Sequence, residues 1–159
     1  AAKIASPEIL FVLVGGSENE VARIKKEYGL PNIKLVGRRP HKEVAVFLKA
    51  ADILVLPNKS DNQVSEKYTS PLKLFEYMAS RRPIIASDLP ATREVLNENN
   101  AVLVAPNKPA EIVRAVEYLL ANSDFGDKIA KQAFEDAVRK YTWKKRAEDI
   151  INFISESRK

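Results

Sequence analysis

Short apolar runs alternate along the chain with longer segments in which apolar residues recur every three or four positions. The runs at 9–14, 33–36, 52–57, 84–87 and 101–104 are rich in β-branched residues, as buried strands are. Helical periodicity marks the segments between them, at 18–28, 42–50, 70–79, 90–96 and 110–121. Strands that alternate with helices favour a parallel sheet covered on both faces. The sequence therefore predicts an α/β fold with a parallel sheet of at least five strands flanked by helices.

The strands stop after residue 104, and the rest of the chain is helical in pattern. We expect two helices in 124–159, separated at Tyr141 and Thr142, with Thr142 as the N-cap of the last helix. That last helix carries apolar residues that need a partner surface, namely Ile150, Ile151, Phe153 and Ile154. We find no boundary to a second domain, so 1–159 is predicted to be a single domain ending in the C-terminal helices 124–159.

The composition excludes several kinds of site. The chain has 159 residues, 45% of them apolar and 30% charged, with no cysteine and one histidine. A disulfide framework, a thiolate nucleophile, a cysteine zinc site and a histidine-rich metal site are therefore excluded, and we expect no metal. No apolar run reaches the ~20 residues needed to cross a bilayer, and the N-terminus lacks a signal-peptide pattern. We therefore expect a cytoplasmic protein.

The net charge of +5 and the isoelectric point near 9.4 leave three classes of partner open. Lysines and arginines are scattered among acidic residues, with no basic block interleaved with aromatics, so nucleic acid is not the expected partner. A modest positive excess also suits a phosphate-bearing small molecule, or an anionic membrane surface contacted by a longer protein.

The segment Ser70–Ala79 is the main candidate for a binding site. Ser70 is a suitable N-cap and Pro71 a suitable first helical residue, and a helix N-terminus favours an anion such as phosphate. Lys73 could meet that phosphate, and the carboxylate of Glu76 could accept hydrogen bonds from two neighbouring hydroxyls, such as those of a ribose. The alternative is that Lys73 and Glu76, three residues apart, form an ordinary exposed ion pair.

Other candidates follow the predicted strands. Gly15 and Gly16 end the first strand and allow a ligand to approach the backbone closely, although their spacing is not that of a dinucleotide fingerprint. Arg38 follows the second strand, at the edge where open α/β sheets bind ligands. The single histidine, His41, is interpreted as a helix-start or surface residue rather than a catalytic one. The polar segment 58–69 is long for a βα connection and is typical of a functional loop.

The order of these signals resembles the C-terminal, donor-binding domain of retaining GT-B glycosyltransferases of family four. The resemblance covers about residues 9–145 and is most specific between Ala51 and Glu94. It is carried by Val-Gly-Gly at the first strand, Ala-Asp-Ile-Leu-Val-Leu-Pro at 51–57, Leu-Phe-Glu-Tyr-Met-Ala at 74–79 and Arg-Pro-Ile-Ile-Ala-Ser at 82–87. It implies a Rossmann-like half of a GT-B architecture.

In that family a paired-glutamate motif, E-x7-E, places one glutamate near the donor sugar and the next on the nucleotide ribose. Glu76 matches the second glutamate, whereas the first position is occupied by Tyr68, and Glu66 is out of register. A subset of the family is similar to this chain, with Ser-Pro-Leu-Lys-Leu-Phe-Glu-Tyr-Met in place of the usual glycine-rich loop. We therefore expect the donor to contact Gly15, Gly16, Arg38, Ser70, Pro71, Leu72, Lys73 and Glu76, and we assign no catalytic residue.

The resemblance implies an enzyme that uses a nucleotide-sugar such as a UDP- or GDP-sugar as substrate, with no further cofactor and no metal. The family's acceptor-binding N-terminal domain, and its arginine and lysine that hold the diphosphate, would lie before Ala1. We therefore expect little or no transferase activity from this chain alone, and peripheral membrane association is a property to consider for the full-length enzyme. Two alternatives stay open: a sugar-nucleotide epimerase of the same architecture, and a non-catalytic α/β interaction module.

Overall fold

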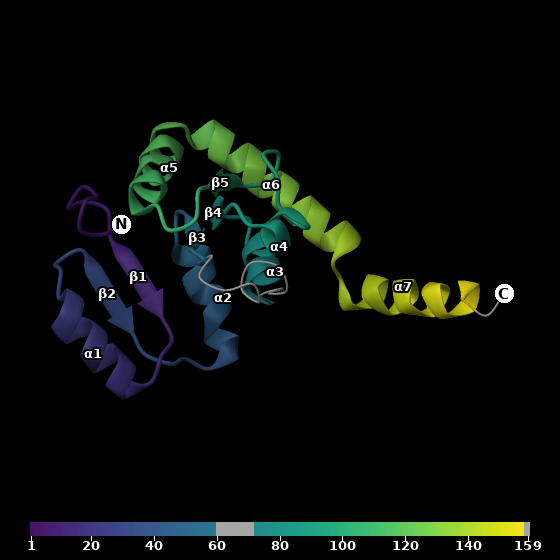
Figure 1. Ribbon diagram of the computed structural model, residues 1–159, viewed down its shortest axis with the longest axis horizontal. Coiled ribbons are helices and arrows are strands. Elements are labelled where there is room, and N and C mark those ends of the chain that lie inside the picture. The colour runs from purple at the N-terminus through teal and green to yellow at the C-terminus, as the bar shows by residue number, and fades with distance from the viewer. Residues whose placement is uncertain (60–71, 158–159) are drawn as a thin grey trace.

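The computed structural model of the protein describes residues 1–59 and 72–157 (Figure 1). Its strands are β1 Phe11–Val14, β2 Ile33–Val36, β3 Leu54–Leu56, β4 Ile84–Ser87 and β5 Val102–Val104. Its helices are α1 Glu18–Tyr28, α2 His41–Ala50, α3 Leu72–Ala79, α4 Pro90–Arg93, α5 Pro109–Ala121, α6 Ser123–Lys140 and α7 Trp143–Glu156. The predicted alternation of strands and helices is confirmed.

All the strand pairs are parallel, but they form two ladders rather than one. β1 pairs with β2, from Phe11 opposite Ile33 to Val14 opposite Val36. β4 lies between β3 and β5 in a second ladder of three strands. The predicted α/β class is therefore confirmed, and within the described residues its five strands are divided between two parallel sheets.

The expectation that the first strand is buried on both faces is wrong for β1. Val12, Leu13 and Val14 are 46%, 45% and 41% exposed, and successive side chains of a strand point to opposite faces. The physical reason is that elements packed on the faces of a sheet bury the side chains of a strand, whereas the pairing with β2 covers only an edge of β1. The apolar run predicts a strand, but it does not predict which elements cover the faces of that strand.

The core lies around the three-stranded sheet. One cluster joins the inner faces of α3 and α6 to β4, and its fully buried members include Leu74, Met78, Ile84 and Ala133. A second cluster on the other side of the sheet joins α5 and α6 to β4 and β5. Among the apolar residues of α5, Val113, Val116 and Leu119 are buried whereas Leu120 is 52% exposed.

The remaining boundaries differ from the predictions by a few residues. α4 ends at Arg93 rather than near residue 96, because Leu96 leaves the helix to become a fully buried core residue. α2 is amphipathic as expected, with Val44, Phe47 and Leu48 half-buried and none of its residues fully buried.

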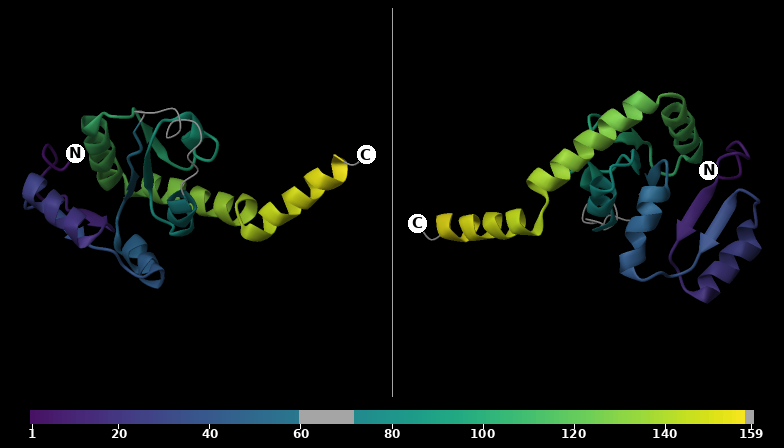
Figure 2. Two further views of the ribbon diagram at one scale, coloured as in Figure 1. Left: turned by 60° about the horizontal axis from the view of Figure 1, so that its bottom comes forward. Right: turned by 180° about the vertical axis from the view of Figure 1, so that it is seen from behind.

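The C-terminal part consists of two helices with the predicted break. Thr142 caps α7, and its hydroxyl accepts a hydrogen bond from the backbone N–H of Lys145. α6 packs along the core, whereas α7 extends away from the rest of the molecule, at the end opposite β1, β2 and α1 (Figures 1 and 2). No residue of α7 is buried. Among the described helices, none is long and apolar enough to cross a membrane.

Candidate functional site

The carboxyl ends of β1 and β2 are joined by backbone hydrogen bonds that continue past the strands. The N–H of Gly15 donates to the carbonyl of Val36 over 2.9 Å, and the N–H of Arg38 donates to the carbonyl of Gly16 over 3.0 Å. Gly15 and Gly16 have φ values of +124° and +83°, which side chains with a Cβ rarely adopt. The two predicted glycines, which we call the glycine turn, therefore lie beside the backbone of Arg38 at this edge of the sheet.

A capping box follows the glycines directly and starts α1. The carboxylate of Glu20 accepts from the N–H of Ser17 over 2.7 Å and from its hydroxyl over 2.9 Å, while the Ser17 Oγ accepts from the N–H of Glu20. The bond from the Ser17 backbone lowers the pKa of Glu20, and the bond from the Ser17 hydroxyl adds to this effect. Our sequence analysis did not select Glu20, although the Ser-x-x-Glu spacing after a strand is a readable capping signal.

A cleft of about 270 Å³ lies at this edge of the sheet, and both α3 and the glycine turn line it. Lys73, on the first turn of α3, lines it opposite Gly15 and Gly16. The remaining lining residues come from β1, α1 and β2: Leu13, Val14, Glu20, Val21, Ile24 and Leu35. Two separate predictions, the glycine pair and the lysine of α3, are thus brought together around one space, although more than fifty positions of sequence separate them.

Glu76, one turn further along α3, contacts the first residue of α2. Its Oε1 lies 2.9 Å from Nε2 of His41, and the Glu76 side chain is 34% exposed against 87% for His41. The expected alternative of an exposed Lys73–Glu76 pair is therefore not the arrangement of these residues, because Glu76 pairs with a residue from another helix. His41 does begin a helix, as predicted, and its contact with Glu76 has no signal in the sequence.

The other predicted site residues that the structure describes do not line the cleft. Arg38 is exposed and is tied to the site through its backbone, and Leu72 is 67% exposed at the start of α3. Ser70 and Pro71 lie outside the described residues, as do Glu66, Tyr68 and most of the predicted loop 58–69. The predicted helix start at Ser70 therefore remains a prediction, and the described part of α3 begins at Leu72.

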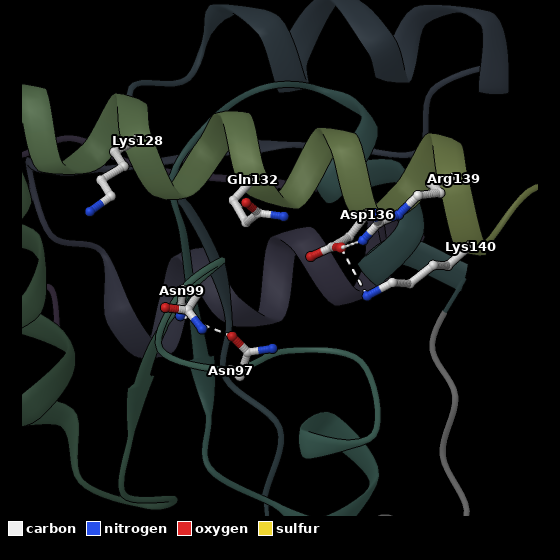
Figure 3. Close-up of a pocket in the computed structure, with 7 residues that line it drawn as sticks. All are labelled: Asn97, Asn99, Lys128, Gln132, Asp136, Arg139 and Lys140. Atoms are coloured by element: carbon white, nitrogen blue, oxygen red, sulfur yellow. Dashed lines mark hydrogen bonds and ion pairs between the residues drawn. The ribbon is translucent and has the colours of Figure 1, made fainter.

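A second cleft, of about 350 Å³, lies between α6 and the 97–100 turn (Figure 3). Its centre is the buried carboxylate of Asp136, which lies 3.0 Å from Nζ of Lys140 and 3.5 Å from Arg139, and which accepts from Asn100 Nδ2 over 3.1 Å. Two of its cations are thus engaged by one carboxylate, and its lining includes none of the residues selected from the sequence. We therefore place the candidate site at the glycine cleft.

Residues 1–59 and 72–157 contain no group of three or more histidine, cysteine, aspartate or glutamate side chains arranged to hold an ion. The candidate residues are a lysine and two glycines that line the cleft, and a carboxylate one turn further along α3 that is paired with an imidazole.

Comparison with known proteins decides the family. Residues 1–122 match the family described as glycosyl transferases group 1, which is more than half of the chain. The chain belongs to this family. The resemblance read from the sequence is thereby confirmed, and the Gly15–Gly16 turn, Lys73 and Glu76 all fall within the matched residues.

Most of the relatives that match this group 1 chain are glycosyltransferases by name. It is 27% identical over 143 residues to the putative teichuronic acid biosynthesis glycosyltransferase TuaH of Bacillus subtilis, covering 89% of this chain and 35% of that protein. The chain therefore spans about a third of the length of this relative.

Solved structures share the fold. HepE of Anabaena, crystallised in complex with UDP, superposes with a TM-score of 0.81 at 17% identity, covering 98% of this chain and 43% of HepE. The C-terminal domain of the group 1 glycosyl transferase LpcC of Francisella tularensis superposes with a TM-score of 0.53 at 18% identity, covering 86% of this chain and 89% of that domain. At these identities the likeness establishes the fold alone.

Proposed function

We propose that this chain is the nucleotide-sugar-binding domain of a longer glycosyltransferase, which transfers a hexose from a UDP- or GDP-sugar to an acceptor with retention of configuration and without a metal ion. The observation that carries the proposal is the convergence of Gly15, Gly16 and Lys73 around one cleft, with Glu76 one turn along the same helix. Family membership supports the reaction class, and the UDP complex of HepE supports a nucleoside diphosphate as the ligand.

Each of these residues has a chemical role in the proposed site. The carboxylate of Glu76 accepts hydrogen bonds from the ribose hydroxyls, because an ionised carboxylate can accept from two donors at once. Lys73 meets the phosphates as a compact positive charge. Gly15 and Gly16 let the nucleotide approach the backbone, because no side chain stands in its way.

The departing nucleoside diphosphate needs its growing negative charge stabilised in the transition state. Fixed donors and cations aimed at that charge supply this stabilisation without a metal. Lys73 is the described residue that we propose for this part, and we expect further cations from the rest of the longer enzyme. We therefore propose that this chain binds the donor and has little transferase activity by itself, since the acceptor would be held by another domain.

A structure without a cleft at the carboxyl ends of the strands would favour the interaction-module alternative. The cleft at Gly15 and Gly16 lies at that edge and counts against it. We further propose that the full-length enzyme acts in the cytoplasm, in line with a chain that has no cysteine.

Isothermal calorimetry tests the proposed binding, with UDP and GDP titrated separately into the chain. We expect saturable binding of one of the two, and at least about tenfold weaker binding after Glu76→Ala, because a ligand loses hydrogen bonds to a charged group. The matched control is Glu117→Ala, which removes an exposed carboxylate from α5. No saturation with either nucleotide, or equal affinities of wild type and Glu76→Ala, would contradict the proposal.

A further inference from the structure

We propose that His41 is a positioning residue, which holds the Glu76 carboxylate in the orientation that accepts the ribose hydroxyls of the donor. The inference rests on the proposed function, in which Glu76 contacts the ribose. It adds a second helix to the site, since His41 begins α2 whereas Glu76 belongs to α3.

The chemistry of the two groups indicates which atom donates. His41 Nε2 lies 2.9 Å from Glu76 Oε1, within ordinary hydrogen-bond distance. An ionised carboxylate only accepts, so the proton of this bond is carried by Nε2 of the imidazole. The bond occupies one acceptor position on Oε1, and among the described residues it is the hydrogen bond that the Glu76 carboxylate makes. In the proposed arrangement Oε2 is the atom that a ligand diol meets.

The backbone that leads to His41 is tied to the glycine turn. β2 ends at Val36, the N–H of Arg38 donates to the carbonyl of Gly16, and Pro40, with a φ of −55°, immediately precedes His41. The start of α2 therefore lies close in sequence to the turn that lines the cleft, and the imidazole links that start to the Glu76 carboxylate. Lys73, three residues before Glu76, lines that same cleft.

A contribution to stability does not account for this contact. The imidazole is 87% exposed, and exposed pairs of this kind contribute little to folding. A glutamate side chain nevertheless has several rotatable bonds, and one fixed partner reduces the conformations that a ligand must otherwise order. The expected consequence is tighter binding of ligands that use Glu76, with the fold unchanged.

The first test compares UDP with 2′,3′-dideoxy-UDP by calorimetry. We expect His41→Ala to weaken UDP binding about 3- to 10-fold, the effect expected when the ligand itself must order one side chain. His41→Gln should restore most of the affinity, because its amide N–H can replace the Nε2–H. Neither variant should change the affinity for the dideoxy nucleotide, which has no ribose hydroxyls for Glu76 to bind.

A double-mutant cycle shows whether His41 acts through Glu76. In a Glu76→Ala background, His41→Ala should have no further effect on UDP affinity. The control is Lys42→Ala, which changes the next, exposed residue of α2 and should leave binding unchanged. Equal losses from His41→Ala in both backgrounds, or an equal loss for the dideoxy nucleotide, would overturn the assignment.

The contact can also be measured without any nucleotide. The chain has one histidine, so its imidazole NMR signals belong to His41 without ambiguity. Glu76→Gln should shift these signals more than Glu43→Gln, which removes a carboxylate from the first turn of α2. If Glu76→Gln does not shift the imidazole signals, this result alone overturns the inference.

The outcomes separate this inference from the proposed function. If the unaltered chain binds neither UDP nor GDP, the proposed function fails, and the imidazole signals still decide whether His41 orients Glu76. If Glu76→Ala weakens UDP binding and His41→Ala does not, the proposed function stands and the positioning role proposed for His41 is refuted.

Discussion

His41 Nε2 lies 2.9 Å from Glu76 Oε1, and this contact joins the first residue of α2 to the second turn of α3, although a whole strand separates the two helices in the sequence. It changes how Glu76 is understood. The spacing in the sequence would pair Glu76 with Lys73, three residues earlier on the same helix, as an exposed ion pair. In the structure Lys73 faces the glycine cleft and Glu76 is held from α2, so the lysine and the carboxylate are available for different parts of one ligand.

The separate roles of Lys73 and Glu76 predict different ligand dependence. Lys73→Met should weaken UDP binding about tenfold and leave uridine binding unchanged, because uridine has a ribose but no phosphate. Calorimetry with the two ligands measures this, and Lys131→Met on the exposed face of α6 is the control. A loss of uridine affinity equal to that of UDP would show that Lys73 does not contact phosphate.

The glycine turn should tolerate no side chain at Gly15. We expect Gly15→Ala to lower the free energy of unfolding by about 1–2 kcal/mol, because its φ of +124° is strained for a residue with a Cβ. Gly37→Ala is the matched control, since a Cβ there meets only Val21, at 4.0 Å, and its φ lies outside the strained range. Urea denaturation of both variants measures the difference, and equal stabilities would contradict the backbone argument.

Asp136 should contribute to stability in a pH-dependent way. Burial raises its pKa, but hydrogen bonds from Asn100, Lys140 and Gln132 outweigh burial, so that the pKa in the folded protein lies below its ordinary value. A lowered folded pKa means that the stabilisation is complete above the unfolded value of about 3.9 and is lost as the pH falls through the folded value.

Asp136→Asn should therefore cost about 1–3 kcal/mol at neutral pH, where the carboxylate holds its partners, and less as the pH falls below about 4. Urea denaturation of wild type and variant at a series of pH values measures this. Asp127→Asn is an exposed substitution on the same helix, and its difference in stability from wild type should not become smaller as the pH falls. A stability difference that does not depend on pH would rule out the ionised carboxylate as its source.

The two C-terminal helices should respond differently to truncation of a large apolar side chain. Ile129 of α6 is 1% exposed, so Ile129→Ala should cost about 2–5 kcal/mol, whereas Phe153 of α7 is 71% exposed and Phe153→Ala should cost less than about 0.5 kcal/mol. Thermal or urea unfolding of the two variants measures this. A large loss for Phe153→Ala would mean that α7 packs against the body of this chain.

The sequence by itself determined the order of strands and helices, the parallel class and the family, because apolar periodicity, caps and turn residues act over a few neighbouring positions. The Thr142 cap, the Gly15–Gly16 turn and the α6–α7 break are of this kind, and all were readable from local residues.

Only the tertiary structure decided which of these elements meet. Nothing local shows that five strands form ladders of two and three, that β1 keeps both faces exposed, or that His41 pairs with Glu76. The physical reason is that each depends on the relative placement of elements far apart in the chain. Periodicity indicates which face of an element is apolar, and packing alone decides what lies against that face.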